Sequence, residues 1–261
     1  MPKNLYIITG ASRGLGFAMA HQLAQPDAFL LCISRQENAQ LAVHAKAAGC
    51  ALEQWPLDLD HGLEAAAMLR QWLLHKGSTP GVFQTATLIN NAALLPKIGP
   101  LSASDPAEIA KVLRVGLEAP MQLCSAFLGA TESWKTPAGQ PLMRRILNIS
   151  SGLGRGAMAS QASYCATKAG MDHFTRCLAL EEAAKPNGAR VCAMAPGVID
   201  TDMQVHLRSA DAAAFADRSR FLDLKANGQL SSAADCARKL LAYLNAPEFG
   251  RETIADIRDA A

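Results

Sequence analysis

The chain has 261 residues, of which 50% are hydrophobic and 18% are charged. This composition supplies enough apolar material for a large core and excludes an intrinsically disordered protein; because single α/β domains of this size are common, we expect one domain over residues 1–261. The 25 basic and 23 acidic residues leave a formal net charge of +2 and form no basic cluster, so we expect no nucleic-acid partner.

The seven cysteines are scattered along the chain, and none forms a C-x-x-C pair. An odd number without paired spacing argues against a disulfide framework and a zinc site, so we expect reduced cysteines in the core and no metal. The first apolar run, residues 5–8, is too short for the hydrophobic region of a signal peptide, and no uncharged stretch of 18 residues follows. We therefore expect a cytoplasmic protein with no membrane partner.

Short apolar runs alternate along the chain with longer Ala/Leu-rich segments, which is typical of strands joined by crossover helices. In chain order the pattern predicts strand 4–9, helix 14–25, strand 28–34, helix 38–48, strand 51–57, helix 61–75, strand 85–90, helix 105–129, strand 144–150, helix 162–185, strand 189–195, helix 232–245 and strand 252–256. This is an α/β chain with a doubly wound Rossmann fold, a seven-stranded parallel sheet and helices on both faces. Residues 131–143 are expected to form a connection, and residues 197–230 a helical segment that covers the substrate.

A glycine-rich loop follows the first predicted strand and leads directly into a helix. Its glycines let the backbone turn tightly and approach a phosphate, and the start of the helix offers unpaired N–H groups. The motif predicts a dinucleotide site built from Gly10, Ser12, Arg13, Gly14, Leu15 and Gly16.

The same loop also matches G-x-S-x-G, the nucleophile elbow of α/β-hydrolases, which would make Ser12 a nucleophile. The order of residues argues against that alternative, because the elbow would lie on the first strand and the last histidine, His206, falls in an irregular segment. A Walker loop is excluded because no Gly-Lys-Ser/Thr follows.

Arg35 stands at the end of the second predicted strand, where an NAD enzyme carries an acidic residue for the ribose hydroxyls. A guanidinium suits the 2′-phosphate of NADP, and Arg13 in the glycine loop offers a second cation. The pair favours NADPH/NADP+ as the cofactor.

Tyr164 and Lys168 lie four residues apart near the start of a predicted helix, so both face the same side. A cation beside a phenol stabilises the phenolate and lowers the tyrosine pKa towards the range used in acid–base catalysis. Ser151 follows the preceding strand and places a hydroxyl at the carboxyl edge of the sheet, where open α/β sheets bind ligands. We predict Ser151, Tyr164 and Lys168 as the catalytic residues.

Together these motifs resemble the short-chain dehydrogenase/reductase family, in family order and over essentially the whole chain. The matching residues are the loop 9–16, the turn Asn90-Asn91-Ala92, Ser151, the pair Tyr164 and Lys168, and Pro196-Gly197 with Thr201. The resemblance implies that Tyr164 protonates a substrate carbonyl, that Ser151 hydrogen-bonds the same oxygen, and that Lys168 holds the ribose and lowers the pKa of Tyr164. It further implies cofactor contacts from Asp58, Leu59, Asn90, Asn91, Ala92, Tyr164, Lys168, Pro196, Gly197, Val198 and Thr201; Asp58 is also a candidate helix cap.

Two positions depart from the family pattern. Ala93 replaces the glycine of the Asn-Asn-Ala-Gly turn, and Gly116 aligns with the helix asparagine that completes the family's catalytic set. We expect Gly116 to give a slower or differently relayed enzyme; the alternative is a non-catalytic NADP(H)-binding regulatory protein.

Within the family, the chain resembles the sepiapterin reductases and the bacterial benzil (diketone) reductases, on residues 178–182 and 195–204. This resemblance implies a carbonyl reductase acting on a small molecule, with Ser151, Tyr164, Met203 and Asp256 as substrate contacts; Met158 and Phe221 are further candidates for the pocket wall. It also implies a homodimer or homotetramer formed through helices 105–129 and 162–185.

Overall fold

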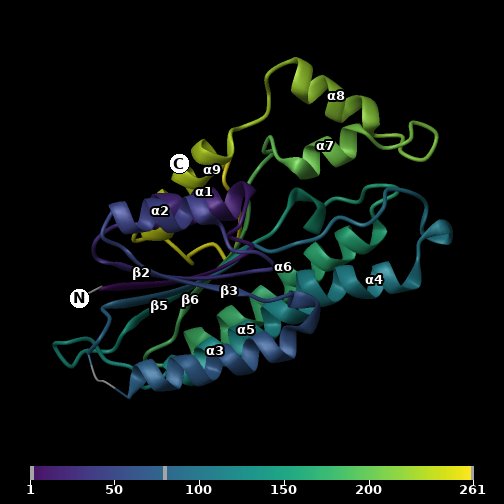
Figure 1. Cartoon of the computed structure of the whole chain (residues 1–261). Coiled ribbons are helices and arrows are strands. Elements are labelled where there is room, and N and C mark those ends of the chain that lie inside the picture. The colour runs from purple at the N-terminus through teal and green to yellow at the C-terminus, as the bar shows by residue number, and fades with distance from the viewer. Residues whose placement is uncertain (1–2, 79–80, 260–261) are drawn as a thin grey trace.

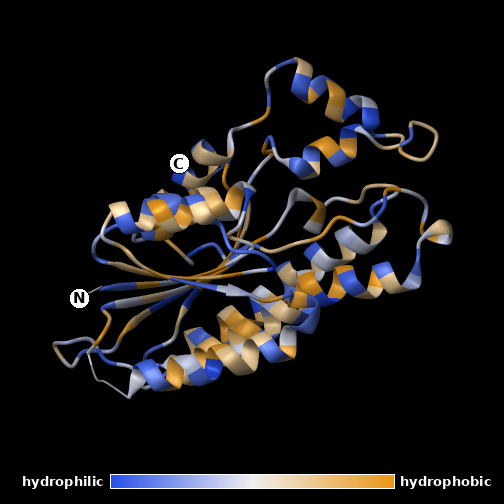
Figure 2. Ribbon diagram, in the orientation of Figure 1, coloured by the Kyte–Doolittle hydropathy of each residue, from blue (hydrophilic) through white to orange (hydrophobic). Residues whose placement is uncertain are grey.

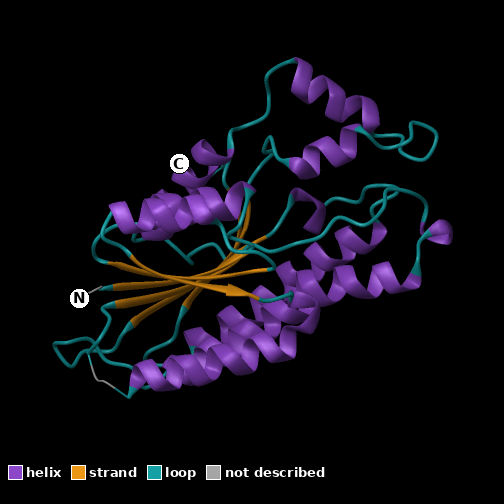
Figure 3. Cartoon of the chain, in the orientation of Figure 1, coloured by secondary structure: helices purple, strands orange, loops and turns teal. Residues whose placement is uncertain are grey.

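A parallel sheet forms the centre of the molecule in the computed structural model, which describes residues 3–78 and 81–259. Residues 1–2 and 260–261 of the expected domain lie outside the described residues. The seven strands follow the order β3-β2-β1-β4-β5-β6-β7, with helices on both faces (Figure 3). Since β1 lies between β2 and β4, the winding reverses there and opens a crevice at the carboxyl ends of the strands. The predicted doubly wound Rossmann fold is confirmed.

The elements lie close to their predicted ranges. The strands are β1 (Asn4–Thr9), β2 (Ala28–Ser34), β3 (Ala51–Pro56), β4 (Thr85–Asn90), β5 (Met143–Ile149), β6 (Arg190–Ala195) and β7 (Ile254–Asp256). The helices are α1 (Gly14–Leu23), α2 (Ala39–Ala47), α3 (Gly62–Gly77), α4 (Pro106–Leu113), α5 (Ala119–Thr131), α6 (Ala162–Ala183), α7 (Asp202–Arg208), α8 (Arg218–Ala226) and α9 (Ala233–Asn245), with short helical turns η1 (Leu59–His61), η2 (Leu101–Ala103), η3 (Arg114–Glu118) and η4 (Gly152–Gly154).

Two hydrophobic cores lie on opposite faces of the sheet. Helices α1, α2 and α9 cover one face, and α3, α5 and α6 cover the other (Figure 1). Alternate side chains of β1 enter different cores, Tyr6 and Ile8 on the first face and Leu5 and Ile7 on the second. Burial of both faces explains why β1, β2 and β6 are nearly continuous apolar runs, and orange stretches run through the sheet in Figure 2.

The expected single helix 105–129 is wrong, because it is interrupted by the π-helical turn η3. The N–H of Ala119 donates to the carbonyl oxygen of Arg114, five residues earlier. Pro120 follows directly; it lacks an N–H and its ring obstructs the preceding turn, so a regular α-helix cannot continue through this position. Gly116 lies buried inside the interruption. Such bulges often occur at functional sites.

The segment between β6 and β7 carries α7 and α8, which extend away from the sheet in Figure 1, so the helices expected within 197–230 are present. A third, small core holds this segment to the loop after β4; its buried members are Ile98, Leu207, Phe215 and Phe221. Met158 packs against the same core. Phe221 and Met158 therefore pack within this core and do not line the main pocket, contrary to expectation.

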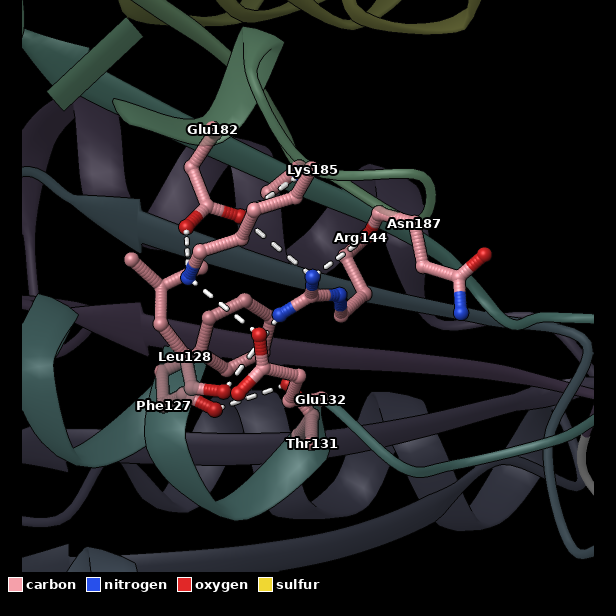
Figure 4. Close-up of polar contacts among 9 residues, drawn as sticks. Phe127, Leu128, Thr131, Glu132, Arg144, Glu182, Lys185 and Asn187 are labelled. Atoms are coloured by element: carbon pink, nitrogen blue, oxygen red, sulfur yellow. Dashed lines mark hydrogen bonds and ion pairs between the residues drawn. The ribbon is translucent and has the colours of Figure 1, made fainter. Parts of the chain in front are cut away.

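A buried ion pair joins elements at the amino end of the sheet (Figure 4). The side chains of Arg144 and Glu182 are each 1% exposed and lie 3.3 Å apart. Arg144 also donates to the carbonyl oxygens of Leu128 and Asn187, while Glu182 accepts from Lys185 and from the N–H of Ala189. The cluster therefore connects α5, β5 and the end of α6, far from the carboxyl ends of the strands.

The cysteines are all free, as expected, but they do not all lie in the core. Cys177 is exposed on α6 and Cys165 is half-buried, whereas the other five are buried. Among the described residues, no helix is long and apolar enough to span a membrane.

Candidate active site

A pocket of about 690 Å³ lies at the carboxyl ends of the strands, beside the point where the winding reverses. Of the predicted cofactor residues, it is lined by Gly10, Ser12, Arg13, Gly14, Leu15, Arg35, Asp58, Leu59, Asn91, Ala92, Tyr164, Lys168, Pro196 and Thr201. Gly16, Gly197 and Val198 are adjacent in sequence but do not line the pocket. Asn90 does not line it either, because its side chain is buried and donates to Asn148. Segments remote in the sequence thus converge on one cavity.

The glycine loop has the backbone that the motif predicts. Gly10 and Gly14 adopt φ angles of +68° and +57°, a region that L-residues with side chains rarely occupy. A side chain at Gly16 would collide with the carbonyl oxygen of Gly10. Gly16 therefore permits the tight turn, while the start of α1 is capped by no side chain and its N–H groups are available to a phosphate.

The turn after β4 holds this loop in place. The Thr9 hydroxyl accepts hydrogen bonds from the backbone N–H groups of Asn91 and Ala92, and the Asn91 side chain donates to the carbonyl oxygens of Thr9 and Gly10. Asn91 therefore supports the loop as well as lining the pocket. Asp58 has two roles: its side chain caps η1 by accepting from the N–H of Asp60, and it also lines the pocket.

Two arginines bring positive charge to the pocket. Arg35 is exposed and has no ion-pair partner among the described residues. Arg13 pairs with Asp202 at the start of α7, with 2.6 Å between Nη1 and Oδ2. Because both side chains of that pair are largely exposed, the pair is weak and Arg13 can exchange partners.

Tyr164 and Lys168 face the pocket from the first turns of α6, as their spacing predicts. Tyr164 is 9% exposed and Lys168 is 2% exposed. The Lys168 ammonium donates to the carbonyl oxygen of Ile149 at 2.7 Å and lies 5.7 Å from the centre of the Tyr164 ring. Ser151 caps η4 through the N–H of Leu153 and is half-buried. It does not line the pocket, but its neighbour Ser150 does.

The expected lowering of the Tyr164 pKa does not occur in this structure. Burial raises the pKa of Tyr164 to about 12, and the Ser151 hydroxyl only partly opposes this effect. Burial likewise lowers the pKa of Lys168 to about 8, while the negative charge of Asp172 raises it. The physical reason is that both groups are removed from water, and the ammonium bonds to a backbone carbonyl instead of the phenol.

The predicted substrate residues are only partly brought together. Met203 lines the pocket from α7. Asp256 does not: it is 7% exposed, and its carboxylate accepts from Arg258 at 2.6 and 2.8 Å and from Arg155 at 3.3 Å. These arginines hold the pKa of Asp256 below its usual value. Both oxygens are already engaged, so the geometry offers no support for a substrate anchor at this residue.

Several pocket residues were not predicted individually. They are Ile33, Ser34, Leu57, Ala93, Leu94, Leu95, Val115, Ile149, Ser150, Ile199, Asp200, Asp202 and His206. Most lie at or just after the carboxyl end of a strand, and this position in the sequence was the signal that could have identified them as pocket residues. His206 lies 3.2 Å through Nε2 from the carbonyl oxygen of Pro96, and no hydrogen bond joins it to Ser12 among the described residues. The hydrolase arrangement is therefore absent from the part of the chain that the structure describes.

The pocket fits a nicotinamide dinucleotide. The glycine loop supplies a phosphate cradle that a side chain at Gly16 would block, Arg13 and Arg35 supply cations, and Tyr164 with Lys168 supplies polar groups at the other end. Within residues 3–78 and 81–259, no group of three or more His, Cys, Asp or Glu side chains could hold a metal ion.

Comparison with known proteins agrees with this arrangement. The family model described as short chain dehydrogenase matches residues 4–212. Benzil reductase ((S)-benzoin forming) of Bacillus cereus is 34% identical over 93% of this chain and 94% of its own, and sepiapterin reductase of Meriones unguiculatus is 33% identical over 97% and 95%. A solved metagenomic short-chain oxidoreductase in complex with NADP is 25% identical with a TM-score of 0.70, covering 98% of this chain and 95% of its own. This chain belongs to the short-chain dehydrogenase/reductase family of oxidoreductases.

Proposed function

We propose that this protein is an NADPH-dependent reductase of small-molecule carbonyls, with a vicinal diketone or a pterin side chain as substrate. One observation carries the proposal: a single pocket is lined by the glycine loop and by Tyr164 and Lys168. The end of β5, which leads to Ser151, lines the same pocket. The similarity to benzil and sepiapterin reductases supports a carbonyl substrate. Residues 1–261 would act as one catalytic domain, with 197–230 covering the substrate.

Preference for NADPH is supported by the charge of the pocket. Arg35 directly follows β2, at the position where a carboxylate would favour the free ribose hydroxyls of NADH, and Arg13 lies in the glycine loop. Guanidinium groups recognise phosphate through paired hydrogen bonds. When bound, the cofactor supplies the hydride that reduces the carbonyl carbon.

Tyr164 would donate the proton to the carbonyl oxygen. A pKa of about 12 keeps its phenol protonated at neutral pH, so the proton is present before the reaction begins. Ser151 would donate a hydrogen bond to the same oxygen, which stabilises the charge that develops there. Lys168 would stabilise the tyrosinate that remains and bind the ribose hydroxyls with its ammonium.

An apolar wall suits the proposed substrates. Leu94 and Leu95 follow β4, and Met203 approaches from α7. Aromatic diketones and pterins present flat surfaces that such side chains can cover. We also propose a homodimer or homotetramer through α4–α5 and α6; exposed apolar side chains on two of these helices, Met121 on α5 and Leu180 on α6, support it.

The test is NADPH oxidation by the purified protein with benzil, 1-phenyl-1,2-propanedione and sepiapterin, alongside Tyr164→Phe and with NADH as a control. We expect turnover that requires Tyr164 and prefers NADPH, and the best substrate will distinguish a diketone from a pterin reductase. Binding of NADPH without turnover of any carbonyl would contradict the proposal and support a non-catalytic NADP(H)-binding regulator, with Gly116 as its cause.

A further inference from the structure

A buried carboxylate lies on α6 one turn beyond Lys168 and takes no part in the proton transfer proposed above. Asp172 is 1% exposed. Tyr164, Lys168 and Asp172 are each four residues apart, so they form a row on one face of the helix. Burial of a carboxylate is costly unless hydrogen bonds or a cation compensate, so its contacts are informative.

Asp172 and Lys168 hold consecutive residues at the end of β5. The Lys168 ammonium donates to the carbonyl oxygen of Ile149, and the Ser150 hydroxyl donates to Oδ1 of Asp172. Ser150 lines the pocket, and its backbone N–H donates to Met194 of β6. The next residue is Ser151. These contacts therefore fix the backbone that carries the proposed hydrogen-bond donor to the substrate.

The second carboxylate oxygen of Asp172 lies against the turn η4. Oδ2 of Asp172 is buried and has no hydrogen-bond partner among the described residues. It faces Gly154 of η4, where a Cβ would lie only 2.7 Å from it. Gly154 thus leaves the space that admits the carboxylate between η4 and α6.

The charged and titratable groups around Asp172 come from three parts of the fold. Lys168 and Arg176 lie on the same helix, Arg155 follows η4, and the Cys192 thiol lies on β6. Burial raises the pKa of Asp172, and the Ser150 hydroxyl opposes this by stabilising the carboxylate. Of the cations, Lys168 alone is almost fully buried, so it depends most on a nearby negative charge.

We propose that Asp172, held by Ser150, is a positioning residue that keeps the buried Lys168 ammonium charged beside Tyr164 and fixes the backbone leading to Ser151. The inference rests on the proposed function, because it assigns Asp172 a role through the residues of that same site. The direction of the expected change in the Lys168 pKa follows from Coulomb's law. The negative charge of Asp172 favours protonated Lys168, so removal of that charge lowers the lysine pKa further.

The test is a direct titration of Lys168 by NMR of lysine labelled at Cε and Nζ, from about pH 6 to about pH 10, which spans its pKa of about 8. Comparison with Lys168→Met identifies its signal. In Asp172→Asn we expect the midpoint to fall by roughly one pH unit or more. Because Lys168 loses its proton near pH 8, we expect kcat for NADPH-dependent reduction to fall above that pH in the wild type. In Asp172→Asn this fall should begin at a pH lower by the same amount as the NMR midpoint, while the rates of the two proteins converge at low pH.

Ser150→Ala provides a second variant in case Asp172→Asn does not fold, which thermal unfolding will show. It retains the carboxylate but removes the hydroxyl that holds it, so we expect the Lys168 midpoint to move by less than in Asp172→Asn. Glu182→Gln is the matched control, because it neutralises another buried carboxylate of α6 within the separate Arg144 cluster. It should lower the melting temperature without moving the Lys168 midpoint.

An unchanged Lys168 midpoint in the folded Asp172 and Ser150 variants overturns the inference. The proposed function is tested separately by turnover of the wild-type protein. If wild type reduces no carbonyl, that proposal fails, whereas the NMR titration still decides whether Asp172 supports the charge of Lys168.

Discussion

Replacement of Gly116 by alanine tests whether the side chain of Thr167 occupies the space that a larger residue at position 116 would need. A Cβ at Gly116 would lie 2.5 Å from Cγ2 of Thr167 on α6, compared with ordinary carbon contacts of about 3.5–4.0 Å. Thr167 is 1% exposed and its hydroxyl donates to Ser163 at 2.8 Å, so its methyl cannot turn away freely. An overlap of about 1 Å in a packed core costs about 1–3 kcal/mol, which lowers the melting temperature by about 2–12 °C.

Thr167→Ser removes the methyl and keeps the hydroxyl, and by itself should cost about 1 kcal/mol. If the overlap is the cause, the double variant Gly116→Ala/Thr167→Ser will be no less stable than Thr167→Ser, whereas independent effects would add. Chemical unfolding of the four proteins measures this coupling. Gly129→Ala on α5 is the control, because no atom lies within 4 Å of its Cβ position and it should stabilise by up to about 1 kcal/mol. Additive losses at Gly116 and Thr167 would refute the explanation.

Three further predictions concern the cofactor, the buried ion pair and Lys168. Arg35→Ala should weaken NADPH binding about 10- to 100-fold and leave NADH binding nearly unchanged, as measured by cofactor fluorescence; an equal loss for both would contradict recognition of the 2′-phosphate. Glu182→Gln should destabilise the fold by about 3–5 kcal/mol, because Arg144 would remain buried without its counter-charge, and a loss below about 1 kcal/mol in chemical unfolding would refute that reasoning. The pKa of Lys168 is about 8 in the folded state and higher in the unfolded chain, so between about pH 8 and pH 10 the unfolded chain binds more protons and the free energy of unfolding rises with pH. Lys168→Met removes the cost of burying the ammonium, so it should stabilise the protein below about pH 8, and this gain should shrink as the pH rises to about 10. A gain that stays constant over that range would contradict the lowered pKa.

Local patterns were sufficient for the fold and for the centre of the site. Strand and helix ranges followed from periodicity, and the glycine loop from spacing within a short segment. Tyr164 and Lys168 face the pocket because four residues span about one helical turn. The prediction of one continuous helix over 105–129 failed at η3 although the Pro120 signal was present, since proline within a helical pattern can end, kink or bulge the helix.

The sequence alone determined the family, through the order of its motifs, and the parallel sheet, through the alternation of strands and helices. The position of the pocket followed as well, because many sequences share this topology and bind ligands at the carboxyl ends of the strands. Only the tertiary structure decided that Asp256 is engaged by Arg155 and Arg258, that the buried Asp172 accepts from Ser150 at the pocket, and that Thr167 fills the space beside Gly116. It also reversed the expected direction of the Tyr164 pKa. Burial and the approach of charges from other elements control these properties, and neither is encoded in the spacing of residues along a single segment.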